Sequence, residues 1–231
     1  MKSFSGKHIL VVGASGAFGA ETSRQLIAAG AEVSGTARNA ESSGRLPGEL
    51  HNRLLLDLES SEAITNFASY LNFLPNALDG IVLASGLVAF GSFTDTPIEI
   101  TERLMKVNAL GQLQLVKELT PKLTSSAQSG NEPFVLSISG VISENPMPGL
   151  ASYSASKTAL HGFSLSAGKE LKKLGVSWVD ARPGHTESGL AGRAIFGTAP
   201  NFGTGKEVSQ VVSRMLAGIT NQEKDLPSSA F

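Results

Sequence analysis

The stretch that decides the fold is His8-Ile9-Leu10-Val11-Val12-Gly13-Ala14-Ser15-Gly16-Ala17-Phe18-Gly19. Its first five residues are almost wholly apolar, which is typical of a strand buried on both faces of a parallel sheet. After the glycine-rich segment, residues 20–29 have a helical pattern that Gly30 closes, and Ala31–Ala37 reads as a second strand. Glycines also serve ordinary turns, but strand, glycine turn, helix and strand in this order predict a turn that holds a dinucleotide diphosphate at a helix N-terminus.

The remainder of the chain repeats this alternation of apolar runs and helical patterns. We expect further strands at Arg53–Leu58, Leu78–Ala84, Phe134–Ser139 and Val176–Ala181, with helices at about 61–74, 97–123, 153–163 and 207–218. The pattern predicts an α/β Rossmann fold: a single domain over residues 1–231 with a doubly wound parallel sheet of six or seven strands and helices on both faces. Residues 39–52 are polar, so any helix there is short. Glycines and two phenylalanines at about 189–205 suggest a flexible flap over a substrate.

Composition narrows the class of partner. The chain has 231 residues, 41% hydrophobic and 17% charged, with a net charge of −1 and no cysteine. The absence of a basic excess argues against nucleic acid or an anionic membrane and favours a small molecule. No apolar run approaches the roughly 18–20 residues that span a bilayer. A polar N-terminus and the lack of cysteine lead us to expect a cytoplasmic protein, and the four histidines show no metal-binding spacing.

Polar residues that follow the strands are candidates for binding a nucleotide. Arg38 follows the second strand, where a carboxylate would favour NAD(H), and its guanidinium suits a 2′-phosphate. We therefore favour NADP(H) over NAD(H), the alternative being a solvated surface arginine. Asp57 could bond an adenine amine or could instead cap the next helix. The small residues Ala84-Ser85-Gly86 leave room for a cofactor at the end of the fourth strand.

The segment Tyr153-Ser154-Ala155-Ser156-Lys157 places a phenol and an ammonium group one helical turn apart. An adjacent cation favours the phenolate and would bring the pKa of Tyr153 nearer to the neutral range. The alternative for such a pair is a lysine that lies along a half-buried ring.

The chain resembles the short-chain dehydrogenase/reductase family over almost its whole length. The residues that carry the resemblance occur in order: Gly13–Gly19, Asp57, Ala84-Ser85-Gly86, Asn108, Tyr153-Ser154-Ala155-Ser156-Lys157 and Pro183-Gly184. The resemblance implies hydride transfer between NAD(P)(H) and a small alcohol or carbonyl. It also implies that Tyr153 is the general acid or base, that Lys157 lowers its pKa and holds the nicotinamide ribose, and that Asn108 supports Lys157 through a water.

The residue pattern and the resemblance together predict the residues that contact the cofactor. They are Gly13, Ser15, Gly16, Ala17, Phe18, Gly19, Arg38, Asp57, Leu58, Ala84, Ser85, Gly86, Tyr153, Lys157, Pro183, Gly184, Thr186 and Ser188.

Several departures from the family pattern affect the expected function. Ala17 replaces a glycine, which is mild if its φ is negative. Gly140 stands where the family carries the serine that binds the substrate carbonyl, so Ser139, or else Ser143, is the candidate for that catalytic role. The usual C-terminal strand is not visible. We therefore expect a homo-oligomer that is a dimer rather than a tetramer.

These features together predict an NADP(H)-dependent oxidoreductase with the catalytic residues Asn108, Ser139, Tyr153 and Lys157. The alternative is an NADP(H)-binding regulator or sensor with little catalytic activity, since Gly140 lacks a hydroxyl.

Overall fold

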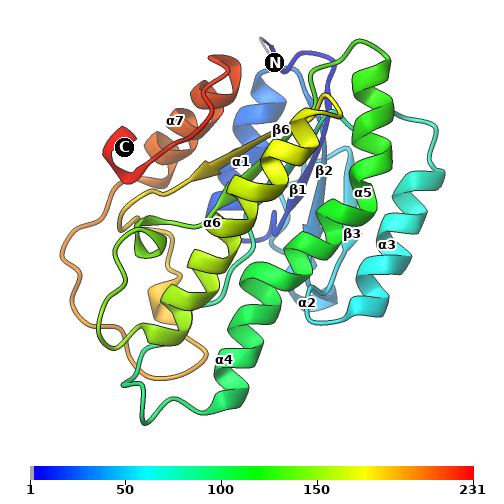
Figure 1. Cartoon of the computed structure of the whole chain (residues 1–231). Coiled ribbons are helices and arrows are strands. Elements are labelled where there is room, and N and C mark those ends of the chain that lie inside the picture. The colour runs from blue at the N-terminus through cyan, green and yellow to red at the C-terminus, as the bar shows by residue number, and fades with distance from the viewer. Residues whose placement is uncertain (1–2) are drawn as a thin grey trace.

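Six parallel strands form one sheet in the order β3-β2-β1-β4-β5-β6 (Figure 1). The computed structural model describes residues 3–231, so residues 1–2 of the polar N-terminal segment lie outside the described residues. The strands are β1 (His8–Val12), β2 (Glu32–Ala37), β3 (Asn52–Leu55), β4 (Gly80–Leu83), β5 (Phe134–Ile138) and β6 (Ser177–Ala181). The order reverses between β1 and β4, and this switch point is where doubly wound sheets bind ligands.

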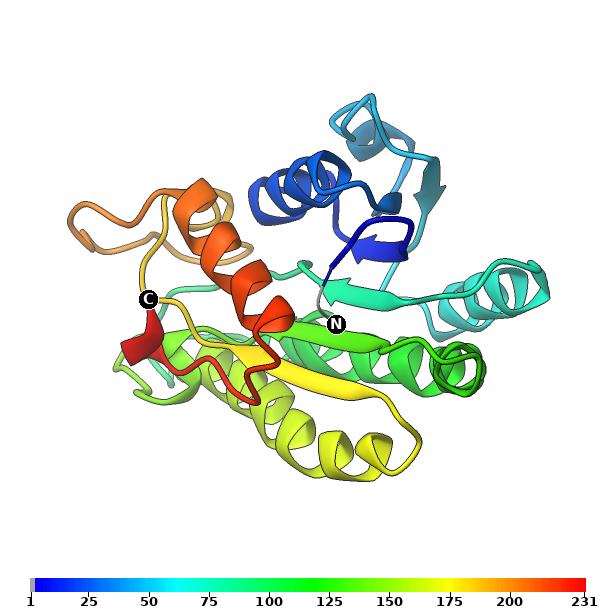
Figure 2. The same cartoon turned by 90° about the horizontal axis from the view of Figure 1, so that it is seen from above.

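Helices cover both faces of the sheet (Figure 2). Side chains of β1 alternate between two hydrophobic cores: Ile9 and Val11 belong to the core that includes residues of α1 and α7, and Leu10 and Val12 to the core that includes residues of α3, α5 and α6. The strand is apolar throughout because both of its faces are buried. The helices are α1 (Ala17–Ala28), α2 (Ala40–Ser43), α3 (Ser61–Phe73), α4 (Ile98–Met105), α5 (Gly111–Gln128), α6 (Ala151–Lys172) and α7 (Val208–Thr220).

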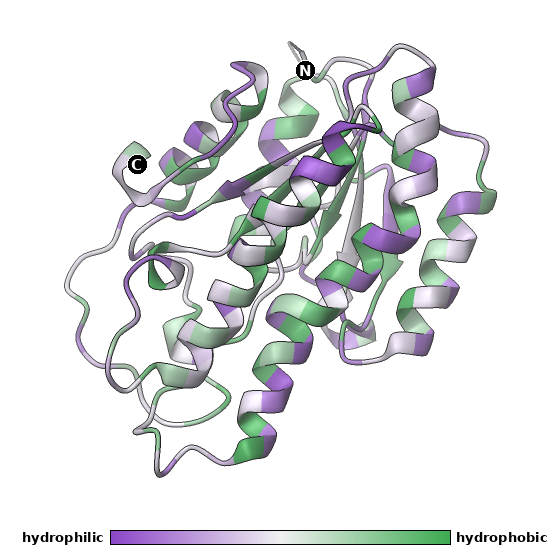
Figure 3. Ribbon diagram, viewed as in Figure 1, coloured by the Kyte–Doolittle hydropathy of each residue, from purple (hydrophilic) through white to green (hydrophobic). Residues whose placement is uncertain are grey.

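The hydropathy of the helices fits this layered arrangement. Apolar and hydrophilic residues alternate around the covering helices in Figure 3, as expected for helices that bury one face against a sheet. No helix within residues 3–231 is both long and apolar enough to cross a membrane.

Two expectations about the elements need correction. The third strand ends at Leu55 and does not reach Leu58. The single helix expected at 97–123 is α4 and α5 joined by a five-residue π-helix, Lys106–Leu110, which contains Asn108. Beyond the six strands, the chain end contributes one parallel bridge, in which Arg182 N–H donates to Leu226 O (2.9 Å) at the open edge of β6.

Candidate active site

A cavity of about 870 Å³ lies at the carboxyl ends of the strands. Its walls come from the segments that follow all six strands and from the flap. Every residue expected at the site lines this cavity except Gly19, Asn108 and the alternative serine, Ser143. The topology therefore gathers at one edge residues that lie up to 175 positions apart in the chain, from Gly13 to Ser188.

The glycine turn comes into close contact with the end of β4. Gly13 has φ +83°, and a Cβ there would lie 2.4 Å from Ser85 Oγ, so the position requires glycine. Ala17 is the first residue of α1 and its φ is not positive, so it fits where the family carries glycine. The first turn of α1 has no acidic residue and no side-chain cap, which suits an anion at this helix N-terminus.

Arg38 lies at the end of the cavity formed by β2 and β3. Its side chain is 53% exposed, and its guanidinium is 3.7 Å from Glu59. Glu59 is already held by Arg103, whose guanidinium donates to both carboxylate oxygens at 2.8–3.0 Å. Sequence reasoning missed Arg45, which also lines this end and lies in the polar segment whose path the sequence does not define.

Asp57 does not cap α3. Its Oδ1 accepts a hydrogen bond from Glu59 N–H (2.9 Å), while the hydroxyl of Ser60 accepts from Ala63 N–H and caps the helix. The capping alternative for Asp57 is therefore wrong, and its carboxylate lines the cavity beside the buried Leu58.

Tyr153 and Lys157 lie one turn apart on α6 and both line the cavity. Lys157 is 5% exposed, and its Nζ donates to Ile138 O at 2.7 Å. Burial lowers the pKa of Lys157 to about 8, an effect that the charge of Asp180 partly opposes.

The pKa of Tyr153 is shifted upward, whereas the sequence led us to expect a downward shift. Burial raises it to about 12, because loss of hydration disfavours the phenolate. At neutral pH Tyr153 is therefore a protonated phenol that can donate a proton.

Asn108 ties the π-helix to two neighbouring segments. Its Nδ2 donates to Leu87 O and to Ser156 Oγ, both at 2.9 Å, and its Oδ1 accepts from Leu87 N–H at 2.8 Å. A Cβ built on Gly86 would lie 3.6 Å from Asn108 Oδ1 and 3.5 Å from Lys157 Nζ, so both groups flank Gly86. The extra residue of a π-helix is a frequent feature of functional sites.

Ser139 lines the cavity, and its hydroxyl belongs to a buried polar network. Its hydroxyl donates to Asp180 Oδ2 at 2.5 Å and accepts from Ser143 Oγ at 3.1 Å. Asp180 also accepts from Ser137 and lies 2.9 Å from His161 Nδ1. Gly140 has φ +75°, a conformation that a serine would strain. The hydroxyl groups of Ser139 and Ser143 thus both donate to acceptors within the protein.

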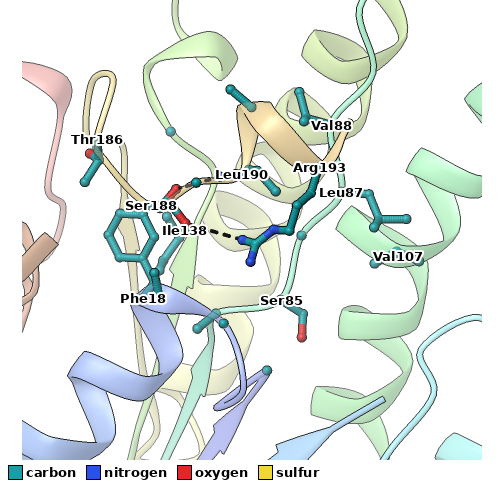
Figure 4. A pocket seen from close by; sticks show the side chains of 18 of the residues that line it. Phe18, Ser85, Leu87, Val88, Val107, Ile138, Thr186, Ser188, Leu190 and Arg193 are labelled. Atoms are coloured by element: carbon teal, nitrogen blue, oxygen red, sulfur yellow. Dashed lines mark hydrogen bonds between the residues drawn. The ribbon is translucent and has the colours of Figure 1, made fainter. Parts of the chain in front are cut away.

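The opposite wall consists of the loop after β6 and the flap. Pro183, Gly184, Thr186 and Ser188 line the cavity, with the hydroxyl of Thr186 donating to Gly184 O at 3.0 Å. Backbone bonds from Ile195 N–H to Val88 O and from Phe90 N–H to Phe196 O, both 2.9 Å, attach the flap to the loop after β4. Sequence reasoning also missed Arg193, which extends from the flap into the cavity (Figure 4).

Comparison with known proteins agrees with this geometry. The family described as short chain dehydrogenase matches residues 7–195. The chain belongs to the short-chain dehydrogenase family. As a member of this family it is an NAD(P)-dependent oxidoreductase of the dehydrogenase/reductase type. It is 27% identical over 240 residues to "Dehydrogenase/reductase SDR family protein 7-like" of Anopheles gambiae, covering 96% of this chain and 74% of that one.

Solved structures share the fold of this short-chain dehydrogenase. A short chain dehydrogenase from Burkholderia cenocepacia J2315 in complex with NADP has a TM-score of 0.83 at 21% identity, over 97% of this chain and 89% of that chain. A 3-ketoacyl-(acyl-carrier-protein) reductase from Brucella melitensis complexed with NADH has a TM-score of 0.87 at 19% identity, over 99% of both chains.

Proposed function

We propose that this oxidoreductase uses NADPH to reduce a small carbonyl compound, with Tyr153 as the general acid. One observation carries the proposal: the Tyr153–Lys157 pair opens on the same cavity as the glycine turn of α1. A dinucleotide that binds along this strand edge would present its nicotinamide to the phenol, because the glycine turn holds the diphosphate in folds of this type.

Tyr153 and Lys157 have different roles in the proposed proton transfer. Bound reduced cofactor supplies a hydride to the carbonyl carbon. Tyr153, with its pKa raised to about 12, keeps its proton at neutral pH and donates it to the carbonyl oxygen as charge develops there. Lys157 has a pKa of about 8, so it is mostly charged at pH 7 and stabilises the phenolate that proton donation leaves.

Two arginines at one end of the cavity favour NADP(H), where Glu41, Asp57 and Glu59 line the wall as well. Residues Ala37 and Arg38 stand where a carboxylate would bind a ribose 2′-hydroxyl, and Arg45 lines the same end. Two guanidinium groups suit a phosphate because they donate in planar pairs. Glu59 competes weakly for Arg38, because Arg103 already occupies its carboxylate. The bound cofactors of similar folds include NADP and NADH, so the preference rests on these residues.

The substrate end of the cavity is apolar. A small hydrophobic cluster of Val88, Phe90, Ile142 and Leu150 packs with Tyr153, and the flap adds Leu190 and Phe202. A carbonyl compound with an apolar substituent fits these walls, since apolar lining with a few polar groups is characteristic of small-molecule sites.

We also expect a homo-oligomer, with a dimer favoured. Helices α4 and α6 contact each other and carry exposed apolar side chains, Ile98 at 64% and Phe163 at 45% exposure. Sedimentation of the purified protein measures the state directly, and a monomer at all concentrations would contradict this expectation.

A cofactor and substrate screen tests the proposed function. The purified protein is mixed with NADPH or NADH and a panel of apolar aldehydes and ketones, and loss of the reduced nicotinamide is followed. We expect turnover with NADPH and a preference for NADPH over NADH. Arg38→Ala should reduce this preference by about 10- to 100-fold, since a charge-assisted hydrogen bond is lost. Tight NADPH binding without turnover of any compound would favour a regulator instead.

A further inference from the structure

Arg193 is an exposed cation that lines the cavity and has no acidic partner among residues 3–231. It ends the short 3₁₀-helix Ala191–Arg193 of the flap, and its side chain extends between Leu190 and Val88 toward the cavity centre (Figure 4). Its Nη2 donates to Ser188 O at 3.3 Å. Within residues 3–231 no carboxylate lies within ion-pair distance of it. A guanidinium has five donors, so most remain for a ligand.

The strand order indicates which ligand group this cation meets. Arg38 follows β2, the glycine turn follows β1, Ser85 follows β4, and Lys157 bonds the last residue of β5. Arg193 lies over the middle of this series, between Phe18 in the first turn of α1 and Val107 (Figure 4). A dinucleotide that spans from Arg38 to Lys157 has its diphosphate at the middle.

We propose that Arg193 binds the diphosphate of the dinucleotide from the flap side, opposite the N-terminus of α1. This inference rests on the proposed cofactor-binding function. The diphosphate would lie between the unpaired N–H groups of the first turn of α1 and the guanidinium, and both interactions favour a doubly charged anion. The glycine turn approaches from the sheet, whereas Arg193 approaches from a segment that also encloses the substrate.

The contact would couple the flap to the cofactor. The segment after Arg193 bonds the loop after β4 through Ile195 and Phe196, and Leu190 and Phe202 close the apolar end of the cavity. An ionic contact at Arg193 therefore holds the substrate-covering segment in place when the dinucleotide is bound. Cofactor binding then prepares the substrate end before the carbonyl compound enters.

Equilibrium binding distinguishes a contact of Arg193 with the diphosphate from a contact with the 2′-phosphate or with the substrate. We measure dissociation constants of NADPH, NADH and 2′-AMP, which lacks the diphosphate, by calorimetry. Arg193→Ala should weaken both NADPH and NADH by about 10- to 100-fold and leave 2′-AMP within about twofold. Arg193→Lys, which keeps the charge but not the planar pair of donors, should lose less than the alanine variant. Thermal melting of each variant checks that it folds.

Arg38→Ala is the matched control, because a different set of ligands should lose affinity. It should weaken NADPH and 2′-AMP and leave NADH nearly unchanged, because it addresses only the 2′-phosphate. Limited proteolysis gives a readout besides binding: NADPH should protect residues 197–203 in the native protein and less so in Arg193→Ala.

Native NADPH affinity in Arg193→Ala would overturn the inference, and a raised KM for the carbonyl compound alone would assign Arg193 to the substrate. An equal loss of 2′-AMP binding would also overturn it, as a general disturbance of the site. Failure of the native protein to bind any dinucleotide would instead overturn the proposed function together with the inference.

Discussion

The hydroxyl of Ser139 donates a hydrogen bond of 2.5 Å to the carboxylate of Asp180. Both side chains are buried, and Ser139 lines the same cavity as Tyr153 and Lys157, whereas Asp180 does not line it. The relationship affects the assignment of the proton chemistry, because a hydroxyl already donating to a charged carboxylate has no proton left for a substrate carbonyl.

Ser139→Ala should therefore have a small effect on catalysis. We expect kcat/KM to fall by less than about tenfold, whereas loss of an oxyanion donor typically costs about 10²–10³. Steady-state kinetics with the best carbonyl substrate measure the effect, with Ser143→Ala as a matched variant in the same network. A loss of 10² or more in Ser139→Ala alone would show that the hydroxyl reorients to reach the substrate.

Much of the fold was predictable because burial imposes a strong pattern. The apolar run of β1 and the glycine turn follow from a strand with two covered faces and from the close approach of Gly13 to Ser85. The direction of Ser139 was not predictable, since side chains alternate along a strand and one residue of register decides between cavity and interior. Arg45 and Arg193 were missed because they lie on segments whose paths depend on tertiary contacts.

The π-helix was also beyond sequence reasoning. Residues 97–123 have the apolar pattern of one continuous helix, and nothing local marks the extra residue. The bulge at Lys106–Leu110 depends on the bonds of Asn108 to Leu87 and Ser156, which come from distant parts of the chain.

Removal of the Asp180 charge should shift the pH profile of turnover. Asp180 raises the pKa of Lys157 against the lowering by burial, so Asp180→Asn should lower that pKa below about 8. The decline of kcat on the alkaline side, which we ascribe to loss of the Lys157 charge, should move to lower pH.

Ser137→Ala is the control for this shift, because it removes a hydrogen bond to Asp180 but keeps the carboxylate. His161 and Arg182 also contact Asp180 and lose a carboxylate partner in Asp180→Asn, so thermal stability is recorded in parallel. Identical alkaline limbs in native protein and Asp180→Asn would contradict the coupling of Asp180 to Lys157.

Lys157→Met should stabilise the free protein while it removes activity. The folded state lowers the pKa of Lys157 from 10.5 to about 8, so the unfolded chain binds the proton more tightly. Below pH 8 the charged Lys157 side chain therefore costs the folded state about 3 kcal/mol. This cost falls, and stability rises, as the pH increases from about 8 to 10.5. After loss of the bond to Ile138 O, the net gain at pH 7 should be about 1–2 kcal/mol.

Denaturant unfolding at pH 7 and at pH 10 measures this effect. The gain from Lys157→Met should shrink at the higher pH, where the native lysine is neutral in the fold. A variant less stable than the native protein at pH 7 would show that the buried ammonium group stabilises the site.

Asn108→Ala should destabilise the protein. The change removes the fully buried Asn108 amide, which leaves the partly buried backbone N–H and C=O of Leu87 without this partner, and it should lower the free energy of unfolding by about 2–4 kcal/mol. Thermal melting would show a fall in Tm of roughly 5–15 °C for a chain of this size. Leu110→Ala, on the same π-helix but half exposed, is the matched control and should change Tm little. Equal melting temperatures of Asn108→Ala and the native protein would contradict a structural role for this side chain.

The most direct test of the central claim is the turnover of Tyr153→Phe compared with the native protein, alongside NADPH affinity measured by calorimetry. Phenylalanine keeps the ring and removes only the proton donor. We predict unchanged NADPH affinity and a fall in carbonyl reduction of about 10²–10⁴-fold, the usual contribution of a general acid. A Tyr153→Phe variant that reduces the same carbonyl compound at the native rate would contradict the assignment of Tyr153 as the acid.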